Sequence, residues 1–148
     1  MPQWTRYATV TAAAFLAAGR IAEAAIEVDK GLAMATERQA RGYRGPLLRL
    51  QAEILMRQEP QNATVAEERL QEALALATEL GMRPEIARCR LGLARADHRI
   101  RGSAAGAEHQ AAGVALFREL GATFWAERAE VEVRELGPAP GNVGKNGR

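Results

Sequence analysis

The two histidines and the single cysteine are the residues of this chain best suited to metal binding or nucleophilic catalysis. His98 and His109 would share one face of a continuous helix, but Gly102 and Gly106 interrupt the segment around them. Spacing indicates no third ligand, so both histidines are expected to be solvated at the surface. Cys89 has no base at a suitable spacing and is expected to behave as a small buried apolar residue. The sequence therefore predicts no catalytic residue, no cofactor and no metal ligand.

Charged side chains recur at helical spacing in three segments. Arg49, Glu53 and Arg57 stand at every fourth position, and the same type of segment recurs twice more. The further members are Arg88, Arg95, Arg99, Arg128 and Glu132. In stacked helices these side chains would line an inner groove that binds another protein or a peptide. The alternative is a solvated face held by weak ion pairs between residues i and i+4.

The sequence gives little support for binding to nucleic acid, to phosphate-bearing cofactors or to a membrane. The chain has 148 residues, 20 of them basic and 18 acidic, for a formal net charge of +2. Acidic residues interleave with the arginines, so there is no contiguous basic stripe for nucleic acid. No phosphate-binding glycine motif is present. No apolar run is long enough to span a bilayer, and the weakly apolar start reads better as a helix than as a signal peptide, so a cytoplasmic protein is expected.

A threefold internal repeat would position these charged side chains. The segments 31–35, 73–77 and 113–117 share one apolar pattern and recur at nearly equal intervals along the chain. A small residue stands seven positions before each segment, and a glycine follows each one where a helix would need a left-handed cap. The small residues are Ala24, Ala66 and Gly106, and the glycines are Gly42, Gly81 and Gly121.

The pattern predicts an all-α protein in which each unit is a helix, a turn and a second helix. Expected helices span about 4–18, 20–41, 46–58, 63–80, 84–101, 104–120 and 122–136, with Asn62 capping the fourth. They group into repeats 4–42, 46–81 and 84–121 and a capping helix 122–136, which together form one domain, 1–136. The proline- and glycine-rich tail 137–148 is expected to be disordered.

Residues Ala66, Leu70 and Ala73, with Leu91-Gly92 in the following helix, resemble the tetratricopeptide repeat, although the period of about 40 exceeds the 34 of that family. Longer stretches resemble the C-terminal helical-repeat region of bacterial class III adenylyl cyclases and of large ATP-binding transcriptional activators. The resemblance implies a right-handed α-solenoid. It carries over no catalytic residue, because the motifs of those catalytic domains are not present.

Two further expectations concern the ends of the array. The third unit has Gly106, Gln110 and Gly113 where the second has Ala66, Leu70 and Ala73, so looser packing is expected there. The first helix offers apolar side chains with little charge between them, a face on which a homodimer could form. Its aromatic members are Trp4, Tyr7 and Phe15.

Taken together, these features favour a non-catalytic protein–protein interaction module. The alternative is the regulatory tail of a bacterial signalling protein, of the cyclase or activator type, acting on a partner catalytic or DNA-binding domain.

Overall fold

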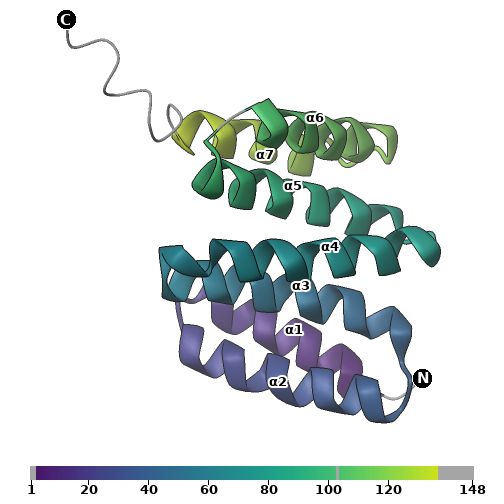
Figure 1. Cartoon of the computed structure of the whole chain (residues 1–148). Helices are drawn as coiled ribbons and strands as arrows, with labels where there is room; N and C mark the ends of the chain where they lie inside the picture. Colours follow the sequence, from purple (N-terminus) through teal and green to yellow (C-terminus); the bar gives the residue numbers. More distant parts are fainter. Residues whose placement is uncertain (1–2, 103, 137–148) are drawn as a thin grey trace, which may run out of the picture.

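The computed structural model describes the backbone of residues 3–102 and 104–136. It describes the side chains of the same residues, except those of residues 3–5, 104–105 and 133–136. The chain forms seven α-helices in this part and no strand (Figure 1). They are α1 (Gln3–Ala17), α2 (Ile21–Glu37), α3 (Arg41–Gln58), α4 (Ala63–Glu79), α5 (Arg83–Ile100), α6 (Ala104–Glu119) and α7 (Thr123–Leu136), with one 3₁₀ turn, η1 (Pro60–Asn62), before α4. The all-α prediction is confirmed.

In the described ranges, none of the helices combines the length and the apolar character that crossing a membrane requires.

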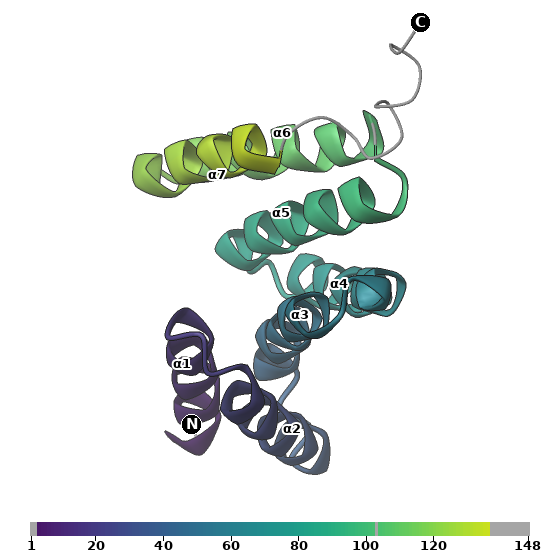
Figure 2. The same cartoon turned by 90° about the vertical axis from the view of Figure 1, so that its left-hand side faces the viewer.

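Each helix packs against the next one along the chain, and α3 also contacts α1 and α5. Turned by 90°, the molecule has α1 and α2 at one end, α3 and α4 in the middle, and α6 and α7 at the other end (Figure 2). The helices thus follow one another through space in chain order. The expected tail, 137–148, lies outside the described residues.

The internal repeat is visible as a shared burial pattern in α2, α4 and α6. Positions i, i+7 and i+11 of the pattern are buried in all three helices. They are Ala24, Gly31 and Ala35 in α2, Ala66, Ala73 and Ala77 in α4, and Gly106, Gly113 and Phe117 in α6. All of these residues except Phe117 are small and leave a flat helix face, so neighbouring helices can approach closely.

The four turns that end α1, α2, α4 and α6 have the same hydrogen bonds. At α4, Met82 N–H donates to the Ala77 carbonyl at 2.8 Å and Gly81 N–H to the Thr78 carbonyl at 3.2 Å, a Schellman pattern. Gly19, Gly81 and Gly121 occupy the left-handed position, with φ between +68° and +77°. At α2 this position is Gln39, with φ +54°.

The prediction that Gly42 closes the second helix is therefore wrong. Gln39 occupies the position in its turn that Gly81 occupies after α4, and Ala40 N–H donates to the Ala35 carbonyl at 2.8 Å as in the other turns. Helix α3 begins at Arg41, so Gly42 is helical and Pro46 lies inside the helix rather than at its start. Asn62 occupies the N-cap position of α4 as expected, but its side chain accepts no hydrogen bond from α4 and instead donates to the Leu55 carbonyl at 3.2 Å.

The expected loose packing of the third unit is contradicted by the glycines of α6. A Cβ built on Gly113 would lie 2.9 Å from Leu91 Cδ2 and 3.1 Å from the Ala87 carbonyl oxygen, and one on Gly106 would lie 3.0 Å from the Ala94 carbonyl oxygen. These glycines are required by the close approach of α5 and α6. Gln110, the third substitution, donates to the Ala129 carbonyl of α7 at 2.9 Å.

Ion pairs between the two helices of a unit also recur with the repeat. Arg41 at the start of α3 pairs with Glu79 at the end of α4, and Arg83 at the start of α5 pairs with Glu119 at the end of α6, at 2.5 and 2.8 Å. Both arginines and both glutamates therefore stand at equivalent positions of successive units. Antiparallel packing within each unit places these helix ends side by side.

Candidate functional site

A groove of about 310 Å³ opens between α3, α5 and α7. Met56 of α3, Leu70 of α4 and Gly92 of α5 contribute its apolar lining, and Met56 and Leu70 are buried. Charged side chains contribute the rest: Arg49, Glu53, Arg57, Arg95, Arg99 and Glu132. Six of the eight side chains predicted to lie together therefore line this groove.

On the α3 side, the arginines are held by two kinds of partner. Arg49 Nε donates to Glu85 Oε1, and this carboxylate is almost fully buried although it belongs to the first turn of α5. Arg57 Nη2 donates to Glu53 Oε1 at 3.0 Å, one turn earlier on the same helix. Its Nη1 donates to the Leu16 carbonyl near the end of α1 at 2.9 Å.

On the opposite side, Arg95 Nη1 donates to Glu132 Oε2 of α7 at 2.9 Å. Arg99, one turn further along α5, donates from Nη1 to the Met56 carbonyl at the end of α3 at 3.0 Å. In the described ranges, Arg99 has no carboxylate within ion-pair distance. The groove thus presents guanidinium N–H donors beside an apolar floor, a combination suited to binding a carboxylate-bearing segment.

Arg57 and Arg99 have the same role in successive units. Each stands near the end of a first helix, α3 or α5, and donates to a carbonyl near the end of the first helix before it, that of Leu16 or Met56. Each guanidinium thus links two neighbouring units. The matching places of Arg57 and Arg99 in the repeat were the sequence signal for this role, but their carbonyl partners follow only from the packing.

Arg88 and Arg128, the other two predicted members, lie outside the groove lining. Their guanidinium carbons lie 5.9 and 5.8 Å from the ring centroid of Trp125, which is 44% exposed. Arg88 also lies 3.7 Å from Glu85, and Arg128 lies 3.9 Å from Glu132. Both arginines therefore lie near the ring of Trp125, a contact that the spacing of the arginines along the sequence does not indicate.

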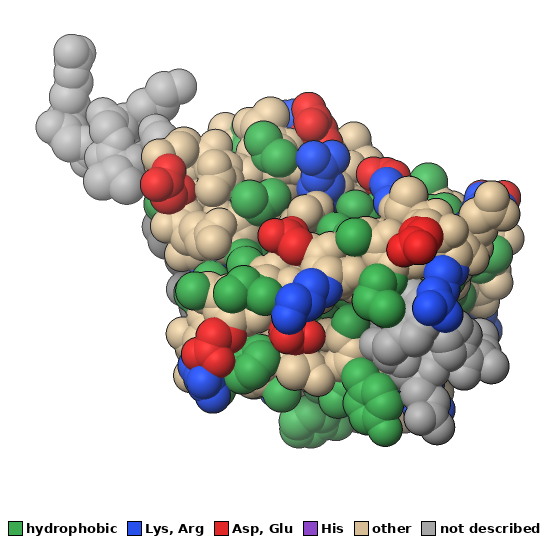
Figure 3. Space-filling view, turned by 90° about the horizontal axis from the view of Figure 1, so that it is seen from below, with side chains coloured by type: hydrophobic (Ala, Val, Ile, Leu, Met, Phe, Trp, Pro, Cys, Tyr) green, Lys and Arg blue, Asp and Glu red, His purple; other side chains and the backbone are tan. Residues whose placement is uncertain are grey.

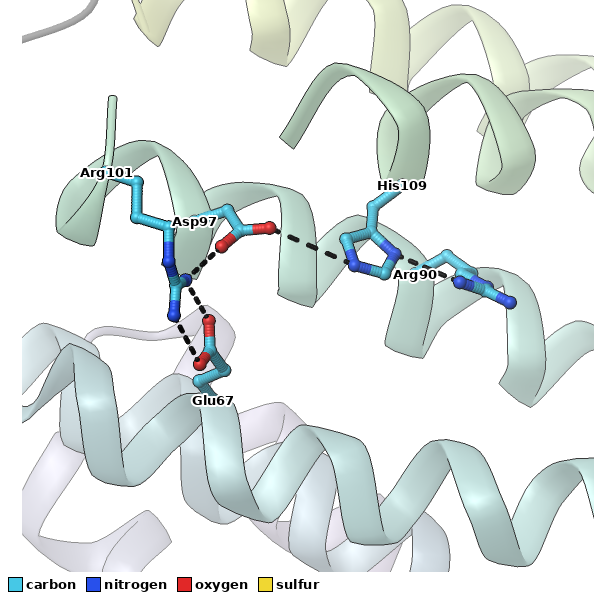
Figure 4. A network of polar contacts seen from close by, with 5 residues as sticks. All are labelled: Glu67, Arg90, Asp97, Arg101 and His109. Atoms are coloured by element: carbon cyan, nitrogen blue, oxygen red, sulfur yellow. Dashed lines mark hydrogen bonds and ion pairs between the residues drawn. The ribbon is translucent and has the colours of Figure 1, made fainter. Parts of the chain in front are cut away.

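A second polar cluster joins α4, α5 and α6 (Figure 4). Arg101, which directly follows α5, donates to Glu67 of α4 at 2.6 Å and also to Asp97 of α5. Asp97 is buried and lies 3.9 Å from His109 Nε2, whose Nδ1 is 3.1 Å from Arg90 Nη1. His109 is less solvated than predicted: its side chain is 25% exposed, and close packing of α5 and α6 places its ring between two side chains of α5.

Hydrogen bonding to Arg101 lowers the pKa of Glu67 below its ordinary value of 4.5, despite the opposing effect of burial. The cluster is thus a charge-assisted link between the second helix of one unit and the first helix of the next.

Cys89 is buried in α5 against Leu48 and Ala73, as predicted for a small apolar residue. Burial raises the pKa of this thiol to about 12, and the neighbouring Glu85 carboxylate adds to the effect. Within the part of the chain that the structure describes, no three His, Cys, Asp or Glu side chains are grouped as metal ligands.

The proposed self-association face on α1 is smaller than predicted. Tyr7 is 65% exposed and Val10 is exposed, whereas Phe15 packs against the core that α1, α2 and α3 share and lies under the Arg20 guanidinium at 4.8 Å. The side chain of Trp4 lies outside the described residues. Viewed from the α1–α2 end, hydrophobic side chains alternate with charged ones (Figure 3). Self-association through α1 stays a prediction, with Tyr7 and Val10 as its exposed members.

Comparisons of this chain with protein-family models, with curated proteins and with solved structures return no significant match.

Proposed function

We propose that this chain is a protein–protein interaction module that binds a segment of a partner protein without catalysis. The observation that carries this proposal is the groove between α3, α5 and α7, in which charged side chains surround an apolar floor. Its volume of about 310 Å³ is large enough for a few side chains of a peptide and too small for a folded domain. An extended or helical segment that follows the groove would contact two successive units and the capping helix.

We further infer that the helices stack as a right-handed, tetratricopeptide-like solenoid. The recurring contacts support this arrangement: the Arg41–Glu79 ion pair has its counterpart in Arg83–Glu119, and the turns share one hydrogen-bonding pattern. In such an array the first helices of successive units share one surface, and α3, α5 and α7 are these first helices. The groove would then be the concave surface of the solenoid.

Selection from a random peptide library on the immobilised protein tests the proposed function without presupposing the chemistry of the ligand. Selected peptides are expected to bind the purified protein and to change their affinity about tenfold in one direction or the other on Arg95→Glu, because this change reverses a charge in the groove. Arg83→Glu is the matched control, since Arg83 also forms an exposed cross-helix ion pair on α5 but lies outside the groove. Peptides that lose affinity equally for both variants, or a selection that yields no binder, would contradict the proposal.

A further inference from the structure

The groove carries an excess of positive charge. Four arginines and two glutamates line it. Glu85 lies outside the lining but pairs with Arg49, so these seven side chains have a net charge of +1. A groove with this excess attracts an anionic segment and repels a cationic one.

The lining arginines differ in what already neutralises them. Arg49 is paired with the buried Glu85, and this pair is part of the packing between α3 and α5. Arg57 and Arg95 are paired with Glu53 and Glu132, whose side chains are 29% and 41% exposed. Ion pairs as accessible as these contribute little to stability, so a competing carboxylate can replace either glutamate at low cost.

Arg99 completes the pattern. It donates one hydrogen bond to the Met56 carbonyl and has no ion pair among the described side chains. Among the described side chains, its other N–H groups therefore have no anionic acceptor in the groove.

We propose that the segment bound in this groove is acidic. One of its carboxylates pairs with Arg99, and others displace Glu53 and Glu132 from Arg57 and Arg95. Before the partner binds, Glu53 and Glu132 therefore neutralise Arg57 and Arg95. This inference rests on the proposed function, and it identifies the class of partner as a protein with an exposed run of Asp or Glu beside apolar residues that contact Met56 and Leu70.

Fluorescence anisotropy with designed peptides tests the charge of the ligand. Three labelled peptides alternate leucine with glutamate, glutamine or lysine, and a single-stranded oligonucleotide serves as a non-peptide polyanion. The glutamate peptide is expected to bind, to bind more weakly as salt rises, and to bind at least tenfold more tightly than the glutamine peptide. The lysine peptide is expected not to bind.

Two variants with opposite effects locate the binding. Arg95→Gln should weaken binding of the glutamate peptide about tenfold, because it replaces a charged donor with a neutral one. Glu132→Gln should tighten the same binding about threefold, because it removes the competing carboxylate. Arg83→Gln, outside the groove on the same helix, should leave binding unchanged.

Several results would overturn the inference. They are equal binding of the glutamate and glutamine peptides, oligonucleotide binding as tight as that of the glutamate peptide, and weakening by Glu132→Gln. If the library selection yields neutral or basic peptides that depend on Arg95, the proposed function stands and the acidic ligand is refuted. If no library peptide depends on Arg95, the proposed function itself fails.

Discussion

Arg99 supplies the hydrogen bond that Pro60 cannot give to the Met56 carbonyl. In a continuing helix the N–H of residue 60 would donate to that carbonyl, but proline has no N–H, and Arg99 Nη1 lies 3.0 Å from the oxygen instead. A side chain from α5 therefore completes the C-terminal end of α3. The corresponding carbonyl of Leu16 accepts from Arg57 and also from Gly19 N–H.

The first prediction follows from the second donor, which the Leu16 carbonyl has and the Met56 carbonyl lacks among the described residues. Arg99→Met is expected to lower the free energy of unfolding by about 1–3 kcal/mol, because the backbone carbonyl of the buried residue Met56 loses its partner. Arg57→Met is expected to cost less, because Gly19 N–H still donates to Leu16. Urea denaturation of both variants measures the difference, and equal losses would mean that the Met56 carbonyl finds another donor.

The second prediction concerns the left-handed residue at the end of α2. Gln39→Gly is expected to stabilise the protein by about 1 kcal/mol, because glycine adopts a positive φ without steric strain. Gly81→Ala at the corresponding position should destabilise it by a similar amount. Thermal denaturation followed by circular dichroism checks both changes. If Gln39→Gly lowers the melting temperature, the contacts of the Gln39 side chain stabilise the fold by more than the positive φ of its backbone destabilises it.

The third prediction compares two glycines within helices. Gly92→Ala should destabilise the protein by about 1–3 kcal/mol, because its Cβ would lie 2.7 Å from Cδ2 of the buried Leu70. Gly42→Ala should stabilise it by about 0.5 kcal/mol, because nothing lies within 4 Å of the added methyl group. Urea midpoints measure both, and tolerance of Gly92→Ala would mean that Leu70 can move aside.

The fourth prediction concerns acid sensitivity. The pKa of Glu67 is lowered in the folded protein by its hydrogen bond to Arg101, so its contribution to stability is complete above the unfolded value and is lost as the pH falls through the folded value. Glu67→Gln should therefore reduce stability at neutral pH and reduce the further loss below pH 4.5. Glu68→Gln, on the same helix, is the control. An unchanged pH profile in Glu67→Gln would contradict the prediction.

The fifth prediction uses Cys89 as a reporter of opening. Burial raises the pKa of the thiol to about 12, so a disulfide reagent at mildly alkaline pH should modify it only when α5 separates from α3 and α4. Labelling should be slow and should accelerate in urea concentrations below the unfolding midpoint. A Cys89→Ala variant carrying Ala33→Cys on the exposed face of α2 should label rapidly. Rapid labelling of the wild type would contradict the burial.

The sequence predicted the helices and most of the groove because both follow from local patterns. Glycines at 81 and 121 marked real helix ends, and arginines at helical spacing marked one face. The turn after α2 could not be predicted, because Gln39 adopts a positive φ, a backbone conformation that is rare for glutamine. The partners of Arg99 and His109 could not be predicted either, since each depends on how two helices meet. Glycine at 113 suggested weak packing, whereas the fold uses its small size for close packing.

The recurrence of Arg41–Glu79 as Arg83–Glu119 has a consequence for how this protein can change in length. Each copy of the pair links the two ends of one unit, and each unit also carries the turn that closes its second helix. A duplicated unit therefore brings its internal contacts with it, and only its two outer faces must fit new neighbours. Unequal recombination between the equivalent turn positions Gln39 and Gly81 would add or remove one whole unit without interrupting a helix. The number of repeat units in the chain is thus a heritable property on which selection can act, in addition to the sequence of each unit.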